Sequence, residues 1–175
     1  MNISDFLVYC ISFSGLLFGI LLYKKTRNEV IPGYRYLRSL MIIIYAIIMA
    51  MFINNFNYGY LDLLFVFLGV LITIIIKLDY FVLGLSNVVS YYLGVGYFYI
   101  ISALIFLIGL PYGSLKSIKV KKTKNIVLIN LLFFIAPLAL FFIKMDIINI
   151  VMSFSIGAIS VMIIKDWYRN FYITY

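Results

Sequence analysis

Residues 54–79 read NNFNYGYLDLLFVFLGVLITIIIKLD, and they contain the unit that the rest of the chain repeats. A polar, aromatic connector leads to Asp62, fourteen uncharged residues fill 63–76, and a turn with Lys77 and Asp79 closes the stretch. With the residues beside it, the apolar run is long enough to cross a thin bilayer, because a membrane-spanning helix needs about 20 residues. The stretch therefore predicts one membrane-spanning helix.

The composition is that of an integral membrane protein. Hydrophobic residues make up 66% of the chain and charged residues 11%, whereas soluble domains are about one quarter charged. In lipid, every backbone polar group must be paired within a helix or a closed barrel. Barrel strands alternate between lipid-facing and lumen-facing residues, and runs such as MIIIYAIIMAMFI at 41–53 do not alternate. The sequence therefore predicts an all-α, polytopic helical membrane bundle.

Six hydrophobic blocks predict about seven passes in a single transmembrane domain that covers 1–175. The block 80–113 holds thirty-four uncharged residues, which as one helix would reach about 50 Å, beyond a bilayer core of about 30 Å. It therefore crosses twice, with a break near 93–96, or forms a re-entrant hairpin. Pro137 predicts a kink in the sixth span. The expected spans are 6–23, 39–53, 61–76, 80–94, 95–113, 126–143 and 147–164.

The net charge of +8 is concentrated in two short connectors. Five of the fourteen basic residues lie within 24–38 and five within 114–125, which is typical of topology determinants and not of a nucleic-acid-binding patch. Both connectors and the C-terminus are expected on the matrix or cytoplasmic side, where anionic lipid headgroups are natural partners. The residues assigned to this role are Lys24, Lys25, Arg27, Arg35, Arg38, Lys116, Lys119, Lys121, Lys122 and Lys124.

Asp62 is the main candidate for chemistry, because it stands at the head of an apolar run. A carboxylate there can act as a proton relay or an ion ligand, since a charge in a low-dielectric region is costly. Alternatively, Asp62 is an interfacial residue at the start of a helix, where the helix dipole favours a carboxylate. Its aromatic neighbours Tyr58 and Tyr60 favour the interfacial alternative.

No catalytic motif stands out. The chain has no histidine and a single cysteine, Cys10, so it lacks the commonest general base and cannot form an intrachain disulfide. Asp79 with Lys77, and Asp146 with Lys144, are expected to pair locally in short turns. We therefore expect no metal and no cofactor, and a packing or scaffold subunit that is not an enzyme by itself.

Small residues recur at spacings that allow helices to approach closely. In a membrane, two small residues four positions apart let a second backbone come near. The predicted helix-packing residues are Gly15, Gly19, Ala46, Ala50, Gly69, Ser86, Ser90, Gly94, Ser153 and Gly157.

Residues 55–62, NFNYGYLD, followed by Phe67-Leu68-Gly69, resemble the third-helix region of subunit 6 (NuoJ-type) of respiratory complex I. In that family a glycine, a polar or acidic residue and an apolar run precede a π-bulged helix. The resemblance covers about 40–80, although Gly69 is one position late and the family has five spans.

This resemblance implies a non-catalytic, cofactor-free membrane-arm subunit of an NADH:quinone oxidoreductase. Such a subunit supports proton translocation and assembles with other membrane subunits. It implies the mitochondrial inner membrane as the location, with a prokaryotic plasma membrane as the alternative.

Residues 26–32, TRNEVIP, resemble the basic connector of prepilin peptidases, which are intramembrane aspartyl proteases. Asp79, at the start of a span, falls near their second catalytic aspartate. Lys24 or Lys25 stands where the first would be, and aspartyl catalysis needs two carboxylates that share a proton. The resemblance implies such a protease or an inactive relative. A small transporter or carrier subunit is the third alternative.

Overall fold

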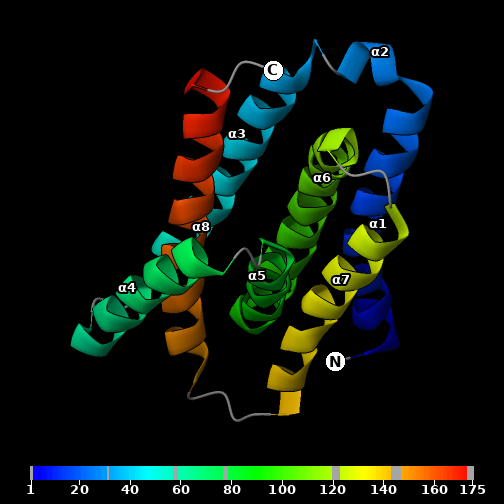
Figure 1. Cartoon of the computed structure of the whole chain (residues 1–175). Helices are drawn as coiled ribbons and strands as arrows, with labels where there is room; N and C mark the ends of the chain where they lie inside the picture. The colour runs from blue at the N-terminus through cyan, green and yellow to red at the C-terminus, as the bar shows by residue number, and fades with distance from the viewer. Residues whose placement is uncertain are drawn as a thin grey trace.

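The computed structural model describes residues 2–30, 32–56, 59–76, 79–119, 123–142 and 147–172. No strand occurs in these ranges, so the predicted all-α class is confirmed (Figure 1). The elements in chain order are α1 (Ile3–Lys25), α2 (Arg27–Val30), α3 (Tyr34–Ile53), α4 (Tyr60–Ile75), α5 (Asp79–Leu93), α6 (Val95–Lys119), α7 (Thr123–Ile135), the 3₁₀-helix η1 (Ala136–Phe142) and α8 (Ile148–Tyr172).

Four helices, α1, α3, α6 and α8, are long and apolar enough to cross a membrane. α4 and a segment within α7 and η1 are shorter apolar helices. This pattern fits an integral, multi-pass membrane protein by length and composition. α2 and the C-terminal ends of α6 and α8 lie toward one end of the bundle (Figure 1). The described parts of both basic connectors therefore flank the same end.

α5 lies inside the bundle, in contact with α6, α7, η1 and α8 (Figure 1). Its Asn87 amide nitrogen donates a hydrogen bond to Ser12 Oγ of α1 at 3.0 Å, and Ser102 Oγ of α6 donates to its side-chain oxygen at 2.8 Å. A buried amide paired at both ends holds its neighbours in register, because an unpaired one would be costly. The predicted packing residues Ser86 and Ser90 are also buried on α5, where their hydroxyls donate to carbonyls of α5 itself.

Glycines make two helix crossings close. Gly15 and Gly19 of α1 lie so near the backbone of α6 that a Cβ on either would overlap a carbonyl oxygen. The same holds between α4 and α8, where Gly69 faces the backbone of α8 and Gly157 faces that of α4. These four glycines lie where the small-residue spacing predicts close approach.

Three other predicted packing residues have different surroundings. Ala46 and Ala50 are exposed on α3, because α3 turns its opposite face, with Tyr45, into the bundle; they form no packing ridge within the chain. Gly94 has a φ of +131°, and a Cβ there would meet nothing within 4 Å. It separates α5 from α6 inside the predicted window, because glycine adopts a positive φ at little steric cost.

Three helices extend further than their hydropathy predicts. α3 begins at Tyr34 and not at 39, while α6 continues past 113 to Lys119 and α8 continues past 164 to Tyr172. Two of the predicted span limits adjoin a charged residue, Arg38 or Lys165, and the third lies three residues before Lys116. In the structure these charged residues lie on the helices themselves, and several of them pair across the bundle.

Pro137 disturbs the helix at the predicted position. α7 ends at Ile135, and the 3₁₀-helix η1 takes over from Ala136. Proline has no N–H to donate to the carbonyl four residues earlier, which weakens an α-helix at that point. The helix changes at Pro137, whereas α6 continues through Pro111 to Lys119. The predicted kink is therefore present as a change from α-helix to 3₁₀-helix.

The close crossing of α4 and α8 can be tested by substitution. Gly157→Ala should lower the thermal stability, because its Cβ would overlap the carbonyl oxygen of Val66 and force the helices apart. Overpacking of this kind costs about 1–3 kcal/mol. Gly96→Ala is the control, since a Cβ at Gly96 meets nothing within 4 Å. Thermal unfolding in mild detergent measures both, and equal midpoints would contradict the crossing.

Candidate functional site

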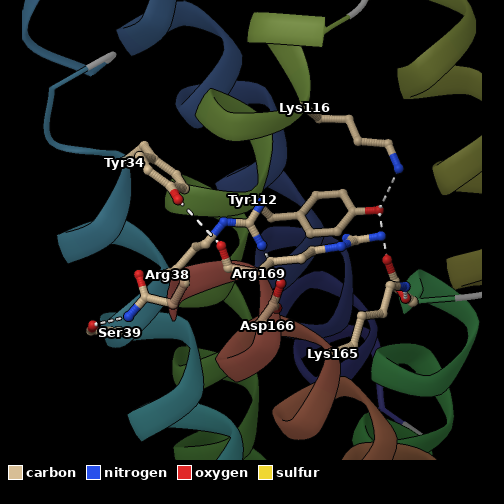
Figure 2. A network of polar contacts seen from close by, with 10 residues as sticks. Tyr34, Arg38, Ser39, Tyr112, Lys116, Lys165, Asp166 and Arg169 are labelled. Carbon is tan, nitrogen blue, oxygen red and sulfur yellow. Dashed lines mark hydrogen bonds and ion pairs between the residues drawn. The ribbon is translucent and has the colours of Figure 1, made fainter. Parts of the chain in front are cut away.

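A polar cavity of about 240 Å³ lies among α3, α5, α6 and α8, close to the end of the bundle that carries the basic connectors. Each helix contributes residues from near one terminus: the start of α3 and α5, and the last turns of α6 and α8. Figure 2 shows the polar side chains that converge there. The lining residues are Arg38, Met41, Tyr45, Asp79, Tyr112, Leu115, Lys116, Met162, Lys165, Asp166 and Arg169.

Two ion pairs join the helices around the cavity. Arg38 Nη1 of α3 lies 2.8 Å from Asp166 Oδ1 of α8, and the two side chains are only 7% and 13% exposed. Lys165 Nζ of α8 lies 3.1 Å from Asp79 Oδ1 of α5. Adjacent residues of α8 thus pair with two different helices. Because an unpaired buried charge is strongly destabilising, these pairs fix α3 and α5 against α8.

A hydrogen-bonded chain connects the second ion pair to α6. Tyr112 Oη donates to the other carboxylate oxygen of Asp79 at 3.2 Å, and Lys116 Nζ donates to Tyr112 Oη at 3.2 Å. Lys116 Nζ also lies 5.2 Å from the centre of the Tyr112 ring, within the range of a cation–π interaction. The Asp79 carboxylate therefore has partners on both α6 and α8.

Two further contacts hold the start of α3 against the end of α8 (Figure 2). Asn170 Nδ2 donates to Ser39 Oγ at 3.1 Å, and Tyr34 Oη donates to the backbone oxygen of Arg169 at 3.2 Å. They flank the pair between Arg38 and Asp166 and keep α8 helical beside α3. The basic side chains of the cavity are therefore held by packed helices and not by loops.

Basic side chains predominate among the charged residues that the structure describes around the cavity. Four basic side chains stand there with two carboxylates. In addition, the Nε of Arg38 and the hydroxyl of Tyr45 are buried and have no hydrogen-bond partner among the described residues. Both can act as donors, and buried donors normally have an acceptor. The arrangement can therefore accept a negatively charged, oxygen-bearing group.

The structure places the predicted headgroup-contacting residues in two groups. Lys24, Lys25, Arg27 and Arg35 are exposed. Arg38 was expected at the membrane surface but is buried, because α3 begins early and turns this side chain toward Asp166. The remaining predicted residues are Lys116, which lines the cavity, and Lys121, Lys122 and the side chains of Lys119 and Lys124, which lie outside the described part.

The predicted local pairs of charges each include a residue outside the described part of the chain, so they stay predictions. Among the described residues, Asp79 pairs with Lys165, eighty-six positions away, and accepts a hydrogen bond from Tyr112. Lys77, Lys144 and Asp146 lie outside the described residues. Asp79 was expected as a charged residue in a short turn, and its pairing with Lys165 places it in the lining of the cavity.

Asp62 lies in the first turn of α4 and accepts a hydrogen bond from Ser153 Oγ of α8 at 3.1 Å. The helix dipole favours a carboxylate at this position. Asp62 does not line the polar cavity. Its surroundings agree with the interfacial alternative, and the predicted packing residue Ser153 serves as its partner.

Sequence reasoning missed several polar residues of the site, namely Tyr45, Tyr112, Lys165, Asp166 and Arg169. The last predicted span ends at 164, and beyond it the aromatic residues Trp167 and Tyr168 are exposed. The missed signal is helical periodicity, because positions 165, 166 and 169 lie on one face of a helix while the exposed aromatic residues lie on another.

No protein-family model matches the chain, and comparisons with curated proteins and with solved structures found no match. Within the described part, no group of three or more His, Cys, Asp or Glu side chains is placed to hold a metal ion. The charge and geometry of the cavity are therefore the features that bear on function.

The pair between Arg38 and Asp166 predicts a specific pattern of stability. Arg38→Met should lower the free energy of unfolding by about 3 kcal/mol, because it leaves the carboxylate of Asp166 buried without its cation. Arg38→Met combined with Asp166→Leu should recover most of this loss. Arg35→Met, at an exposed position of the same helix, is the control. Thermal or denaturant unfolding in detergent measures the series; additive losses in the double variant would contradict the pairing.

Proposed function

We propose that this protein is a multi-pass helical membrane protein that binds an anionic ligand in the cavity among α3, α5, α6 and α8. Two observations on the described lining carry the proposal. Four basic side chains stand with two carboxylates, and the buried Nε of Arg38 and hydroxyl of Tyr45 have no acceptor among the described residues. Buried charges and donors are costly unless they are paired. A bound anion supplies both acceptor oxygens and negative charge to this lining.

The donors of the cavity suit a phosphate or a carboxylate. Arg169 can present two parallel N–H donors to such a group, and Lys116 adds a compact positive charge. The unpartnered Nε of Arg38 and hydroxyl of Tyr45 supply two more donors from the buried side. This combination supports the transporter or carrier alternative, because charged groups retained within a membrane bundle mark sites for ligands and ions.

The proposed topology has about seven passes, formed by α1, α3, α4, α5, α6, the segment of α7 with η1, and α8. The break at Gly94 supports two separate segments within 80–113. The cavity and the basic connectors then lie toward the matrix or cytoplasmic side, as the distribution of basic residues favours.

A role as a membrane-arm subunit of a respiratory complex is a second proposal. Ala46 and Ala50 leave small residues on the outer face of α3, where a helix of another subunit can approach closely. Against it, α4 is a regular α-helix from Tyr60 to Ile75, without the π-bulge that the resemblance implies. Other membrane subunits in a mitochondrial inner or prokaryotic plasma membrane are the partners that this second proposal requires.

One observation supports the prepilin-peptidase alternative, and another argues against it. Asp79 and Asp166 line the same cavity, so a second carboxylate is present near the first. Each of them, however, is paired with a cation of its own, Lys165 and Arg38 respectively. Aspartyl catalysis needs two carboxylates that share one proton. The geometry therefore favours anion binding over proteolysis.

Anion binding can be tested with soluble glycerol 3-phosphate on the purified protein in detergent. The ligand should raise the thermal midpoint of the wild type above that in sodium chloride of equal ionic strength, because it binds only the folded cavity. The variant Lys116→Gln/Arg169→Gln, which removes two basic side chains of the lining, should weaken binding about tenfold or more. It leaves both ion pairs intact.

The matched control is Lys24→Gln/Arg35→Gln, which removes two exposed basic residues outside the cavity. It changes the net charge equally and should bind glycerol 3-phosphate as the wild type does. Equal weakening in the two double variants would show that only the net charge matters and would contradict the proposal.

A further inference from the structure

The polar cavity also has apolar lining residues. They are Met41 of α3, Leu115 of α6 and Met162 of α8. Met41 lies between Arg38 and Tyr45 on one face of α3, because residues three and four positions apart share a face of a helix. The cavity is therefore amphipathic, with apolar side chains next to the donors of the proposed anion site.

Two buried donors on this face of α3 have no acceptor among the described residues. They are the Nε of Arg38 and the hydroxyl of Tyr45. Arg38 contacts Asp166 through Nη1, so the edge of its guanidinium that carries Nε can still bind an oxygen acceptor. Tyr45 leans back toward Arg38, since helical side chains point toward the N-terminus of their helix, and its hydroxyl interacts electrostatically with the carboxylate of Asp166. The two donors therefore approach the same part of the cavity.

We infer that the anion is a short-chain monocarboxylate, with its carboxylate at Arg38 and Tyr45 and its aliphatic part against Met41 and Met162. The inference rests on the proposed anion site and identifies the class of ligand. The two oxygens of a carboxylate match the two donors that lack an acceptor among the described residues, and a short alkyl chain matches the apolar lining. Glycerol 3-phosphate can occupy the donors, but it brings no alkyl chain to the apolar residues.

The size of the cavity favours a small ligand. Its volume of about 240 Å³ lies below the range of about 300–1,000 Å³ that is typical of pockets for drug-sized ligands. Methionine is flexible and fills irregular spaces, so Met41 and Met162 can adapt to alkyl chains of different length. Each methylene group that leaves water for these side chains strengthens binding. The affinity is therefore expected to grow with the length of the carboxylate.

The test compares sodium acetate, propionate and butyrate at equal ionic strength on the purified protein in detergent, with sodium chloride as the baseline. Dissociation constants come from the rise of the thermal midpoint with carboxylate concentration. For the wild type, the affinity should increase about fourfold with each added methylene group. This series needs no variant, and equal affinity for acetate and butyrate overturns the inference.

Met41→Gln tests where the alkyl chain lies, because it keeps the length of the side chain and makes it polar. The variant should bind acetate as the wild type does, but its affinity should increase less than about twofold with each methylene group. The matched control is Met49→Gln, the same change on the same helix at a residue that does not line the cavity, and it should keep the steps of the wild type. Gel filtration and circular dichroism verify that each variant is folded.

Tyr45→Phe tests the position of the carboxylate. It keeps the ring and removes a hydroxyl that is buried and has no acceptor among the described residues. It should weaken binding of all three carboxylates about fivefold, which corresponds to the loss of one hydrogen bond. The thermal midpoint of the ligand-free protein should not fall, whereas removal of a hydroxyl with only a structural role would lower the midpoint and leave the affinity unchanged.

The outcomes separate this inference from the anion site on which it rests. Wild-type steps retained in Met41→Gln, or unchanged affinity in Tyr45→Phe, overturn the carboxylate inference. Binding of glycerol 3-phosphate that depends on Lys116 and Arg169 would then still support the anion site. If Lys116→Gln/Arg169→Gln binds both butyrate and glycerol 3-phosphate as the wild type does, the carboxylate inference and the anion site both fail.

Discussion

The two ion pairs of α8 are the constraint on which the rest of the structure depends. Lys165 and Asp166 are adjacent, and each holds a residue of a different helix, Asp79 of α5 and Arg38 of α3. Because taking a charge out of water costs several kcal/mol, each of these residues needs its partner. The pairs therefore fix the starts of α3 and α5 against α8. They also leave a polar cavity where a bundle of this composition would otherwise pack apolar residues.

Close packing elsewhere makes this arrangement rigid. The glycines at the α1–α6 and α4–α8 crossings let backbones approach, and the buried amide of Asn87 ties α5 to α1 and α6. Donors of a site act most strongly when the surrounding structure already holds them in place. The ion pairs hold Arg38 and Lys165 in place around the cavity, and Lys116 and Arg169 add two further basic side chains to its lining.

More of the fold than of the site could be predicted from the sequence. Length and hydropathy predict an all-α bundle, Gly94 and Pro137 mark where helices break or change, and glycine spacing predicts two crossings. The site depends on pairs that join residues 86 and 128 positions apart, and no local pattern encodes such a partner. Span limits predicted from hydropathy also lie close to charged residues. Arg38 was therefore assigned to a connector, and the end of α8 was left outside the last span. Helical periodicity could have separated the inward-facing residues of α8 from its exposed aromatic residues.

The most direct test of anion binding in the cavity is to locate a heavy anion in crystals of the protein. Tungstate is a tetrahedral oxyanion that resembles phosphate, and its anomalous scattering marks its position without ambiguity. If the cavity is an anion site, one strong tungstate peak should lie among Lys116, Arg169 and the buried Nε of Arg38. The variant Lys116→Gln/Arg169→Gln should show no such peak. A cavity without tungstate, in crystals whose exposed basic residues do bind it, would contradict the claim that this cavity is an anion site.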